Sequence, residues 1–327
     1  MMTDREALWL WLTAAEGVGP KTINDLWAAL CERGMQLEDF HDLGETEWAG
    51  EFRLNARVVR GLAEKKARMD EIVQLAEALR ENGISLLSLE SPNYPASLRK
   101  SLGRSAPPLL YAAGNVSLLE RSAVAVIGAR DASGRGLLIA RAIGAALAQR
   151  GLVVVSGGAR GTDSAAHAGA LHAGGQTIVV LSCGILRFRS DRAYGEQTEP
   201  HSTVFISELD PHMTWQVGGA MERNRIVCGL ASAVVIVEAK ESGGTLDAAK
   251  RAAELRRPRF VVQFDAYDAH SAGNPALLRH GARPLKAEPD PSGESWNVDI
   301  APVVDAAERS APADEPTPDQ MDLFSSQ

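Results

Sequence analysis

Hydrophobic residues in the middle of the chain fall in short runs that alternate with longer stretches of helical periodicity. The runs lie at 124–127, 153–157, 177–182, 203–207, 233–238 and 259–264. Short apolar runs joined by helices are typical of strands that are buried on both faces of a parallel sheet. The pattern therefore predicts an α/β fold, with one doubly wound, mainly parallel sheet in a domain spanning residues 81–288.

The first 75 residues have helical periodicity throughout. Leu8, Trp11 and Leu12 begin an apolar face, and Ile23 and Leu26 continue one at helical spacing. We therefore predict an N-terminal helical domain over residues 1–80, similar to a SAM or helix-hairpin-helix module.

The glycines of the Gly-Val-Gly turn at 17–19 have two possible roles. In a helix-hairpin-helix module, such glycines let backbone N–H groups at a helix start approach a DNA phosphate. In an ordinary small bundle, the same glycines only make a tight turn between two helices. Both interpretations remain open from the sequence.

Prolines are dense between residues 91 and 115, where they fall at 92, 95, 107 and 108. Proline fixes its own backbone angle and lacks an N–H donor, so it is rare inside a sheet. We therefore expect this segment to run in turns and extended backbone along the outside of the sheet domain.

The charge of the chain is unevenly distributed. The formal net charge is −8, yet ten carboxylates and a single arginine fall within residues 288–327. The remainder is close to neutral, so an anion-binding site there must be local rather than a property of the whole surface. Residues 289–327 are rich in Pro, Ala, Asp, Glu and Ser, which predicts a disordered acidic tail.

Other features of the sequence exclude several classes of protein. The N-terminus has no signal-peptide pattern, and the apolar runs are far too short to cross a membrane. The three cysteines, at 31, 183 and 228, form no CxxC pair and no disulfide framework, as expected in a reducing cytosol. We therefore expect a cytoplasmic protein with no metal and no cofactor.

Two glycine-rich turns supply the candidate chemistry. The first follows the run at 124–127 and contains Arg130, and the second follows the run at 153–157 and contains Arg160. These turns connect the end of a strand to the start of a helix. Glycines and arginines at such positions favour a phosphate site, because ligands bind at the carboxyl ends of parallel strands. The alternative is that both arginines form ordinary surface ion pairs.

Five motifs in this order resemble the bacterial DNA-processing protein A family (DprA, also called Smf). They are Tyr-Pro-x-x-Leu at 94–98, Pro-Pro-x-Leu-Tyr-x-x-Gly-Asn at 107–115 and Gly-x-Arg-x-x-Ser at 128–133. The series continues with Ser-Gly-x-Ala-x-Gly-x-Asp-x-x-Ala-His at 156–167 and Arg-Asn-Arg-Ile at 223–226. The resemblance covers about residues 90–285 and implies an extended Rossmann-like fold.

The resemblance also implies a function. It implies a non-enzymatic protein that binds single-stranded DNA without sequence preference, forms homodimers, and loads the RecA recombinase onto incoming strands in natural transformation and recombination. The implied DNA-binding residues lie in the two glycine turns and in the Arg-Asn-Arg segment: Gly128, Arg130, Ser133, Gly157, Gly158, Arg160, Gly161, Asn224 and Arg225.

The chain departs from the family pattern in two loops near this site. Ala220-Met221 stands where the family has Phe-Pro, and residues 187–194 replace a Tyr-Pro-x-x-Asn turn. The second loop carries arginines at 187, 189 and 192 around Phe188. It is either a basic-aromatic contact for a DNA strand or a solvated loop.

An enzyme of related fold is the principal alternative. Gly243-Gly244-Thr245 resembles the glycine-rich loop of LOG-type nucleotide phosphoribohydrolases, in which a glutamate three residues after the threonine performs acid–base chemistry. Here that position is Ala248, and Asp247 lies one place short, about 100° around the helix. A nucleotide-binding protein that uses the same pocket without turnover is a third possibility.

His167 follows Asp163 by one helical turn, which places both on one helix face. A histidine and a carboxylate at this spacing can form an acid–base pair or a structural pair. We favour the structural pair, which would orient the turn before the helix.

The end of the chain contains a short peptide that resembles a partner motif. Gln320, Met321, Asp322, Leu323 and Phe324 are similar to the Gln-Leu-Ser/Asp-Leu-Phe peptide by which bacterial proteins dock on the replication sliding clamp. A hydrophobic-aromatic pair on a disordered tail suits binding in a groove. A chance match within a solubilising tail is the alternative.

Overall fold

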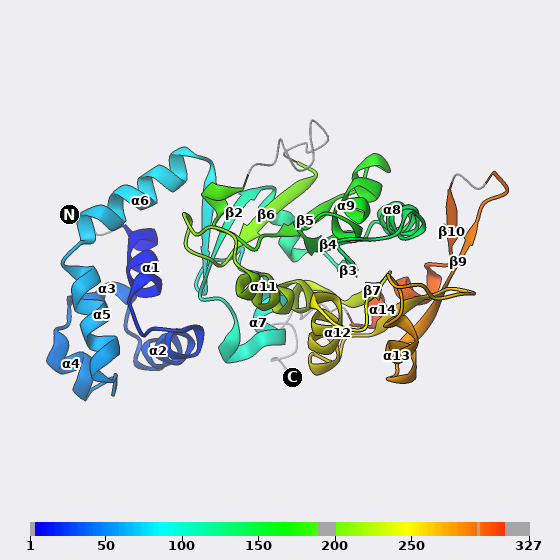
Figure 1. Ribbon diagram of the computed structural model, residues 1–327. Coiled ribbons are helices and arrows are strands. Elements are labelled where there is room, and N and C mark those ends of the chain that lie inside the picture. The colour runs from blue at the N-terminus through cyan, green and yellow to red at the C-terminus, as the bar shows by residue number, and fades with distance from the viewer. Residues whose placement is uncertain (1–3, 189–200, 293–294, 311–327) are drawn as a thin grey trace, which may run out of the picture.

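The computed structural model describes residues 4–188, 201–292 and 295–310. Its N-terminal part is helical, as predicted. The helices are α1 (Arg5–Ala14), α2 (Pro20–Arg33), α3 (Leu37–Asp42), α4 (Glu45–Gly50), α5 (Ala56–Lys66) and α6 (Met69–Glu81). They lie together at one end of the molecule (Figure 1).

The remaining chain forms one sheet, whose described strands run in the order β1-β2-β6-β5-β4-β3-β7-β8-β9-β10. The six strands predicted from the apolar runs are β3 to β8, and each pairs with its neighbours among them in parallel. Strand β9 is parallel to β8, whereas β1, β2 and β10 pair antiparallel at the two edges. The strands are β1 (Ile84–Ser88), β2 (Leu109–Gly114), β3 (Ala123–Ile127), β4 (Val153–Gly157), β5 (Thr177–Val180), β6 (Thr203–Ser207), β7 (Ala233–Ile236), β8 (Arg259–Gln263), β9 (Arg283–Pro289) and β10 (Trp296–Val298).

Helices cover both faces of the sheet, which confirms the doubly wound α/β prediction. On one face, α8 (Gly134–Gln149), α9 (Thr162–His172) and α14 (Ala301–Ser310) share a core with Val124 and Val126. On the other face, α7 (Ala96–Leu102), α11 (Val217–Leu230), α12 (Gly244–Glu254) and α13 (Asn274–Arg279) share a core with Ala125 and Ile127. Alternate strand residues thus enter opposite cores, as the pleat requires. Three short 3₁₀ helices complete the described elements: η1 (Gly103–Ser105), η2 (Val116–Glu120) and η3 (Ile185–Arg187).

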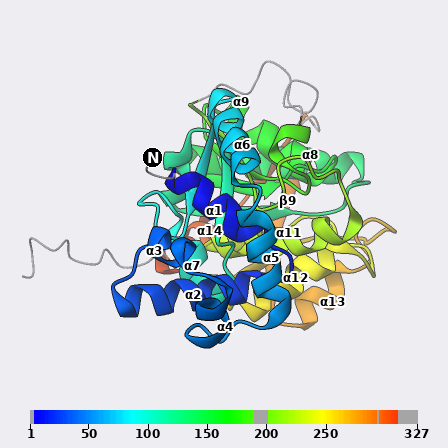
Figure 2. The ribbon, with the colours of Figure 1, turned by 90° about the vertical axis from the view of Figure 1, so that its left-hand side faces the viewer.

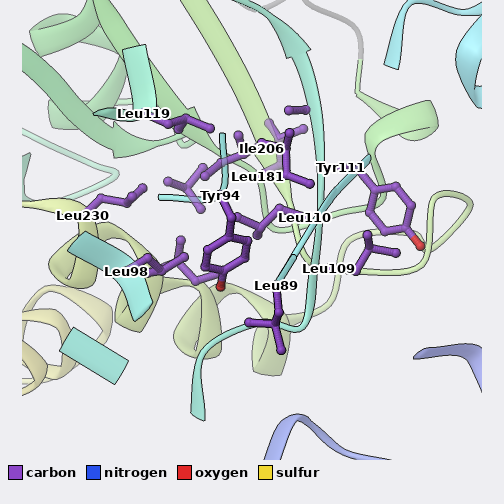
Figure 3. Close-up of a cluster of buried hydrophobic side chains, with 14 of the residues drawn as sticks. Leu89, Tyr94, Leu98, Leu109, Leu110, Tyr111, Leu119, Leu181, Ile206 and Leu230 are labelled. Atoms are coloured by element: carbon purple, nitrogen blue, oxygen red, sulfur yellow. The ribbon is translucent and has the colours of Figure 1, made fainter. Parts of the chain in front are cut away.

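The proline-rich segment differs from the sequence prediction. Instead of lying outside the sheet, residues 109–114 form β2, which pairs antiparallel with β1 and β6. Leu110 is fully buried, and Figure 3 shows it beside Tyr94 and Leu98 in a hydrophobic cluster. The prolines stand before the strand, and the carbonyl of Pro107 accepts a 2.7 Å hydrogen bond from the Tyr94 hydroxyl. Pro107 and Pro108 thus end the turn before β2 begins. The strand itself contains only residues whose backbone N–H can donate a hydrogen bond to a neighbouring strand.

The predicted tail boundary at residue 289 is also wrong. Strand β10 pairs with β9, and α14 buries Val303 and Val304 against the core of the α8 face. The prediction relied on the acidic composition of this stretch. Its apolar residues nevertheless recur at helical spacing between the acidic ones, and that spacing indicates a helix. Residues 311–327, which contain the clamp-like motif at 320–324, lie outside the described residues, so that motif stays a prediction.

The N-terminal helices pack directly on the sheet domain, and they face the viewer in the turned view of Figure 2. The Nε1 of Trp9 donates a 2.8 Å hydrogen bond to Glu90, and the Nδ2 of Asn24 donates a 3.0 Å hydrogen bond to the Ala106 carbonyl. Arg104 also forms an ion pair with Asp25. In the Gly-Val-Gly turn, Gly17 has a φ of 81° and is exposed, so contact between this turn and DNA stays a prediction.

No helix in the described ranges is long and apolar enough to cross a membrane.

Candidate nucleic-acid interface

The candidate site lies where the order of the strands reverses. After β3 the chain builds β4, β5 and β6 on one side, and then returns to place β7 and β8 on the other side. Ligands of doubly wound sheets bind at this switch point, beyond the carboxyl ends of the strands. A pocket of about 430 Å³ occupies this place. It is lined by residues 127–131, by the turn after β4, by one face of α11, and by residues 240, 242–245 and 248.

Basic side chains stand at the mouth of the pocket. Arg130 lines it and is exposed, with its guanidinium 5.4 Å from the ring centroid of Trp215. Lys240 also lines it, with Nζ 3.2 Å from a carboxylate oxygen of Asp131. Arg160 is exposed and directly follows Ala159, which lines the pocket.

The two arginines predicted from the glycine turns do not form the surface ion pairs that the alternative interpretation expects. Among the described residues, neither Arg130 nor Arg160 makes an ion pair or a side-chain hydrogen bond, and Arg130 contacts the ring of Trp215. Their strands, β3 and β4, are hydrogen-bonded neighbours, so both turns lie at the same edge of the sheet. The guanidinium donors of both residues are therefore available to an anion.

A buried charged pair forms the floor of the pocket. Arg223 is 6% exposed, and its Nη1 donates a 3.0 Å hydrogen bond to the Val180 carbonyl. Asp163 is 8% exposed, and the Ser156 hydroxyl donates a 2.6 Å hydrogen bond to the Val126 carbonyl. Burial raises the pKa of Asp163, and the positive charge of Arg223 opposes this shift. Ser156 and the backbone of Ala159 also favour the ionised form of the Asp163 carboxyl and so act to lower its pKa.

Close packing between the two glycine turns explains two of the predicted glycines. A Cβ on Gly128 would overlap the side chain of Thr162, and a Cβ on Gly161 would overlap the backbone carbonyls of Ala129 and Arg130. Gly161 also has a φ of 86°, which side-chain-bearing residues rarely adopt. These glycines therefore position the turn that carries Arg130 against the start of α9.

The start of α8 is not available to a phosphate, contrary to the prediction for Ser133. The backbone N–H of Ser133 donates a 2.9 Å hydrogen bond to Glu238, and the Ser133 hydroxyl donates a 2.6 Å hydrogen bond to the same carboxylate. Ser133 also caps α8 by accepting a hydrogen bond from the Gly136 N–H. The fully buried Glu238 thus occupies the place where an anion would bind this helix. Ser133 supports the turn and does not line the pocket.

The start of α12 is open to the pocket. Gly243 and Gly244 line it, and the N-cap residue Gly243 supplies no side-chain cap. The first N–H groups of a helix lack partners within the helix, and the helix dipole favours an anion there. The sequence prediction placed no phosphate contact at this loop.

The Arg-Asn-Arg segment divides between two sides of α11. Arg223 and Asn224 line the pocket, whereas Arg225 faces away from it. The Nη1 of Arg225 donates a 2.8 Å hydrogen bond to the Ser105 carbonyl, and the guanidinium forms an ion pair with Glu208. The resemblance implied that Arg225 belongs to the DNA-binding site with Asn224, and its placement away from this pocket contradicts that assignment. Helical periodicity could have excluded Arg225 from the pocket, because residues 220, 223, 224 and 227 share one face of α11 and residue 225 does not.

The two glycines at the end of β4 have different surroundings. Gly157 lines the pocket, and the guanidinium of Arg223 lies across it. Gly158 is exposed and does not line the pocket, and a Cβ there would meet only ordinary contacts at 3.6 Å or more.

His167 is a structural residue, but its partner is not Asp163. The imidazole is fully buried, and its Nε2 donates a 3.0 Å hydrogen bond to the Gly157 carbonyl, while Nδ1 contacts the Thr177 hydroxyl. Burial lowers the pKa of His167 to about 4, so the ring is neutral near pH 7. It ties α9 to the last residue of β4 and to the first residue of β5.

The geometry does not favour the phosphoribohydrolase alternative. The residue three places after Thr245, which lines the pocket where those enzymes have a glutamate, is Ala248, and its side chain has no acid–base group. Asp247 points elsewhere, with a carboxylate oxygen 3.3 Å from Nδ2 of Asn224 and another 3.8 Å from Nε of Arg251.

The loop that begins at Arg187 contributes packing at its described end. The ring of Phe188 packs against that of Phe205 at a centroid distance of 5.1 Å and a tilt of 41°, and the Nε of Arg187 donates a 3.0 Å hydrogen bond to the His212 carbonyl. Phe188 is therefore part of the fold. Arg189 and Arg192 lie outside the described residues.

A doubly wound sheet with a glycine-lined, basic pocket at its switch point defines the class of extended Rossmann-like proteins that bind anionic ligands. Within that class, the family model of DNA recombination-mediator protein A matches residues 85–292. The chain belongs to this family.

Relatives and solved structures agree with this assignment. The chain is 29% identical to the DNA processing protein DprA of Bacillus subtilis over 223 residues, which cover 67% of this chain and 74% of the relative. The X-ray structure of DprA from Streptococcus pneumoniae is 26% identical and matches with a TM-score of 0.73, over 85% of this chain and 94% of that one. A structure of DprA from Helicobacter pylori, which addresses its single-stranded DNA binding mode, is 27% identical, with a TM-score of 0.54 over 62% of this chain and 90% of that one.

Proposed function

We propose that this protein binds single-stranded DNA through its phosphate backbone, without sequence preference and without chemistry, and that it serves in DNA recombination and natural transformation. The observation that carries the proposal is the pair of exposed arginines, Arg130 and Arg160, at adjacent strand ends beside the pocket. Guanidinium groups that are free to form bidentate hydrogen bonds suit phosphate oxygens. The single-stranded DNA binding mode described for the relative from Helicobacter pylori supports the same function.

The contacts expected at the pocket are to phosphate rather than to base edges. Arg130, Lys240 and the first N–H groups of α12 surround the opening and can all donate to phosphate oxygens. Phosphate contacts carry no sequence information, so the affinity should be similar for different sequences and should fall steeply with salt.

A salt series tests this function directly. Labelled single-stranded 20-mers of mixed sequence should bind, and log K should fall linearly with log salt concentration. Double-stranded DNA of the same length serves as the comparison. A protein that binds no single strand at low salt would contradict the proposal. So would one that releases free base from nucleoside monophosphates, since that result would restore the enzyme alternative.

We also propose two further properties that the family resemblance implies. They are the formation of a homodimer and the loading of RecA onto single strands. Sedimentation of the full chain tests the dimer. The rate of RecA assembly on single strands coated with single-strand-binding protein, with and without this protein, tests loading. A monomer at all concentrations, or no effect on RecA, would remove the corresponding function and leave DNA binding intact.

A further inference from the structure

Large exposed hydrophobic side chains gather beside the pocket. The described part of the chain exposes six of them, and three fall within nine residues: Met213 (36% exposed), Trp215 (49%) and Met221 (42%). Met221 lines the pocket itself. An exposed tryptophan next to a candidate site is informative, because large apolar side chains grouped on a surface mark contact with a ligand or a partner.

The loop that carries Trp215 is held in place. The Met213 carbonyl accepts a 2.8 Å hydrogen bond from the Gly184 N–H, and the Pro211 carbonyl accepts a 3.1 Å hydrogen bond from the Leu186 N–H. A Cβ on Gly184 would overlap the Asp210 and Pro211 carbonyls, so the two loops are in close contact. Gln216, which follows Trp215, is the N-cap of α11. Trp215 is therefore fixed at both ends while its side chain stays half exposed.

Trp215 is also next to the positive charge of the site. The guanidinium of Arg130 lies 5.4 Å from its ring centroid, a cation–π contact that joins the pocket mouth to the indole. Arg130 has no other ion pair or side-chain hydrogen bond among the described residues, so it can donate to a phosphate while it stays beside the ring. The pair thus presents a phosphate donor and an aromatic surface side by side.

We propose that Trp215 stacks on a nucleobase of the bound single strand, next to the phosphate that Arg130 contacts. This inference rests on the proposed single-stranded DNA binding. The adjacent positive charge favours a nucleic acid over an apolar peptide or a lipid tail, because a nucleotide joins an anion to an aromatic ring within one unit and those two do not. Every base has a π face, so the contact adds affinity without sequence preference.

Two oligonucleotides with equal charge separate stacking from phosphate binding. A thymidine 20-mer and an abasic 20-mer of the same length are titrated against the full-length protein at one salt concentration. The native protein should prefer the thymidine strand. Trp215→Ala should lose about tenfold or more of its affinity for the thymidine strand and keep its affinity for the abasic strand, whereas Trp215→Phe should keep most of both. Tyr267→Ala, which removes another exposed aromatic side chain at 37% exposure, serves as the matched control and should change neither.

The outcomes distinguish the stacking contact from the proposed binding of single-stranded DNA. If Trp215→Ala binds both strands as the native protein does, or weakens both equally, the stacking contact is absent although DNA binding stands. If the native protein binds neither strand, the proposed function fails, and the stacking contact fails with it. The melting temperature of Trp215→Ala is compared with that of the native protein. Equal melting temperatures show that a selective loss of affinity comes from the missing ring and not from unfolding.

Discussion

The guanidinium of Arg223 lies across Gly157, in the space that a Cβ on that residue would fill. From there its Nη1 donates a hydrogen bond to the Val180 carbonyl, and its charge acts on the buried carboxylate of Asp163. The absence of a side chain at the end of β4 therefore lets an arginine from α11 form the floor of the pocket. The relationship joins two segments 66 residues apart in the sequence.

Replacing Gly157 with alanine should displace Arg223. The variant would lose the hydrogen bond to Val180 and the positive charge that most opposes the raised pKa of Asp163. We expect the free energy of unfolding to fall by about 1–3 kcal/mol, the usual range for a hydrogen bond to a charged group. Denaturant titration measures the change.

Gly158→Ala is the matched control for that prediction. Its added Cβ meets only side-chain atoms at 3.6–3.8 Å, so its stability should remain within about 0.5 kcal/mol of the native value. Equal losses in both variants would show that the strand end, rather than Arg223, is sensitive to substitution.

Removing Arg130 and Arg160 together should weaken binding to single strands and flatten its salt dependence. Each phosphate contact contributes about 0.7 to the slope of log K against log salt for single strands, so the double alanine variant should lose about 1.4. Its affinity at low salt should fall by about tenfold or more. Fluorescence anisotropy across a salt series measures both quantities.

The control for charge alone is Arg141→Ala with Arg150→Ala. Both residues are exposed on or just after α8 and do not line the pocket, and the variant loses the same two charges. If this control loses as much slope as the Arg130 and Arg160 variant, the DNA is attracted by net charge and no particular contact at the turns exists.

Ser133→Ala should reduce stability and leave DNA affinity unchanged. The hydroxyl caps α8 and donates to the buried Glu238, so its loss should cost about 1 kcal/mol or somewhat more. Ser133→Thr keeps the hydroxyl and should retain most of the stability. A selective loss of DNA affinity at native stability in Ser133→Ala would reinstate this residue in the phosphate site.

The fold could be predicted where local sequence determines structure. Strands such as β3 are apolar on both faces, and that pattern has few other interpretations. Strand β2 was missed because Pro107 and Pro108 directly precede it and suggested a turn. Helix α14 was missed because acidic residues conceal the helical spacing of Val303, Val304 and Ala307.

The site could be predicted only in part, for a different physical reason. Glycine turns are local signals, so the pocket at the switch point followed from them. Glu238 lies 105 residues from Ser133, and no sequence pattern indicates that its carboxylate closes the start of α8. Arg225 was assigned to the site because the family resemblance implied it together with Asn224, although consecutive residues of a helix point about 100° apart.

His167 should make stability depend on pH in a defined window. Burial lowers its pKa from 6.5 in the unfolded chain to about 4 in the folded protein, so the unfolded state binds the proton first. The contribution of His167 to stability is therefore complete above pH 6.5 and is lost as the pH falls toward 4, by up to about 3 kcal/mol. Asp163, whose pKa is raised by burial, acts in the opposite sense.

The difference between native protein and His167→Gln isolates this effect, because every other titrating group is common to both. Glutamine can donate to the Gly157 carbonyl but does not take up a proton in this range. The free energy of unfolding, measured by denaturant at intervals from pH 4.5 to pH 7.5, should fall more steeply with acid in the native protein than in the variant. His172→Gln, which changes an exposed histidine at the end of the same helix, should keep the native slope. Parallel slopes for native protein and His167→Gln would mean that the pKa of His167 is the same in the folded and the unfolded chain, because only then does folding change no proton binding at this residue.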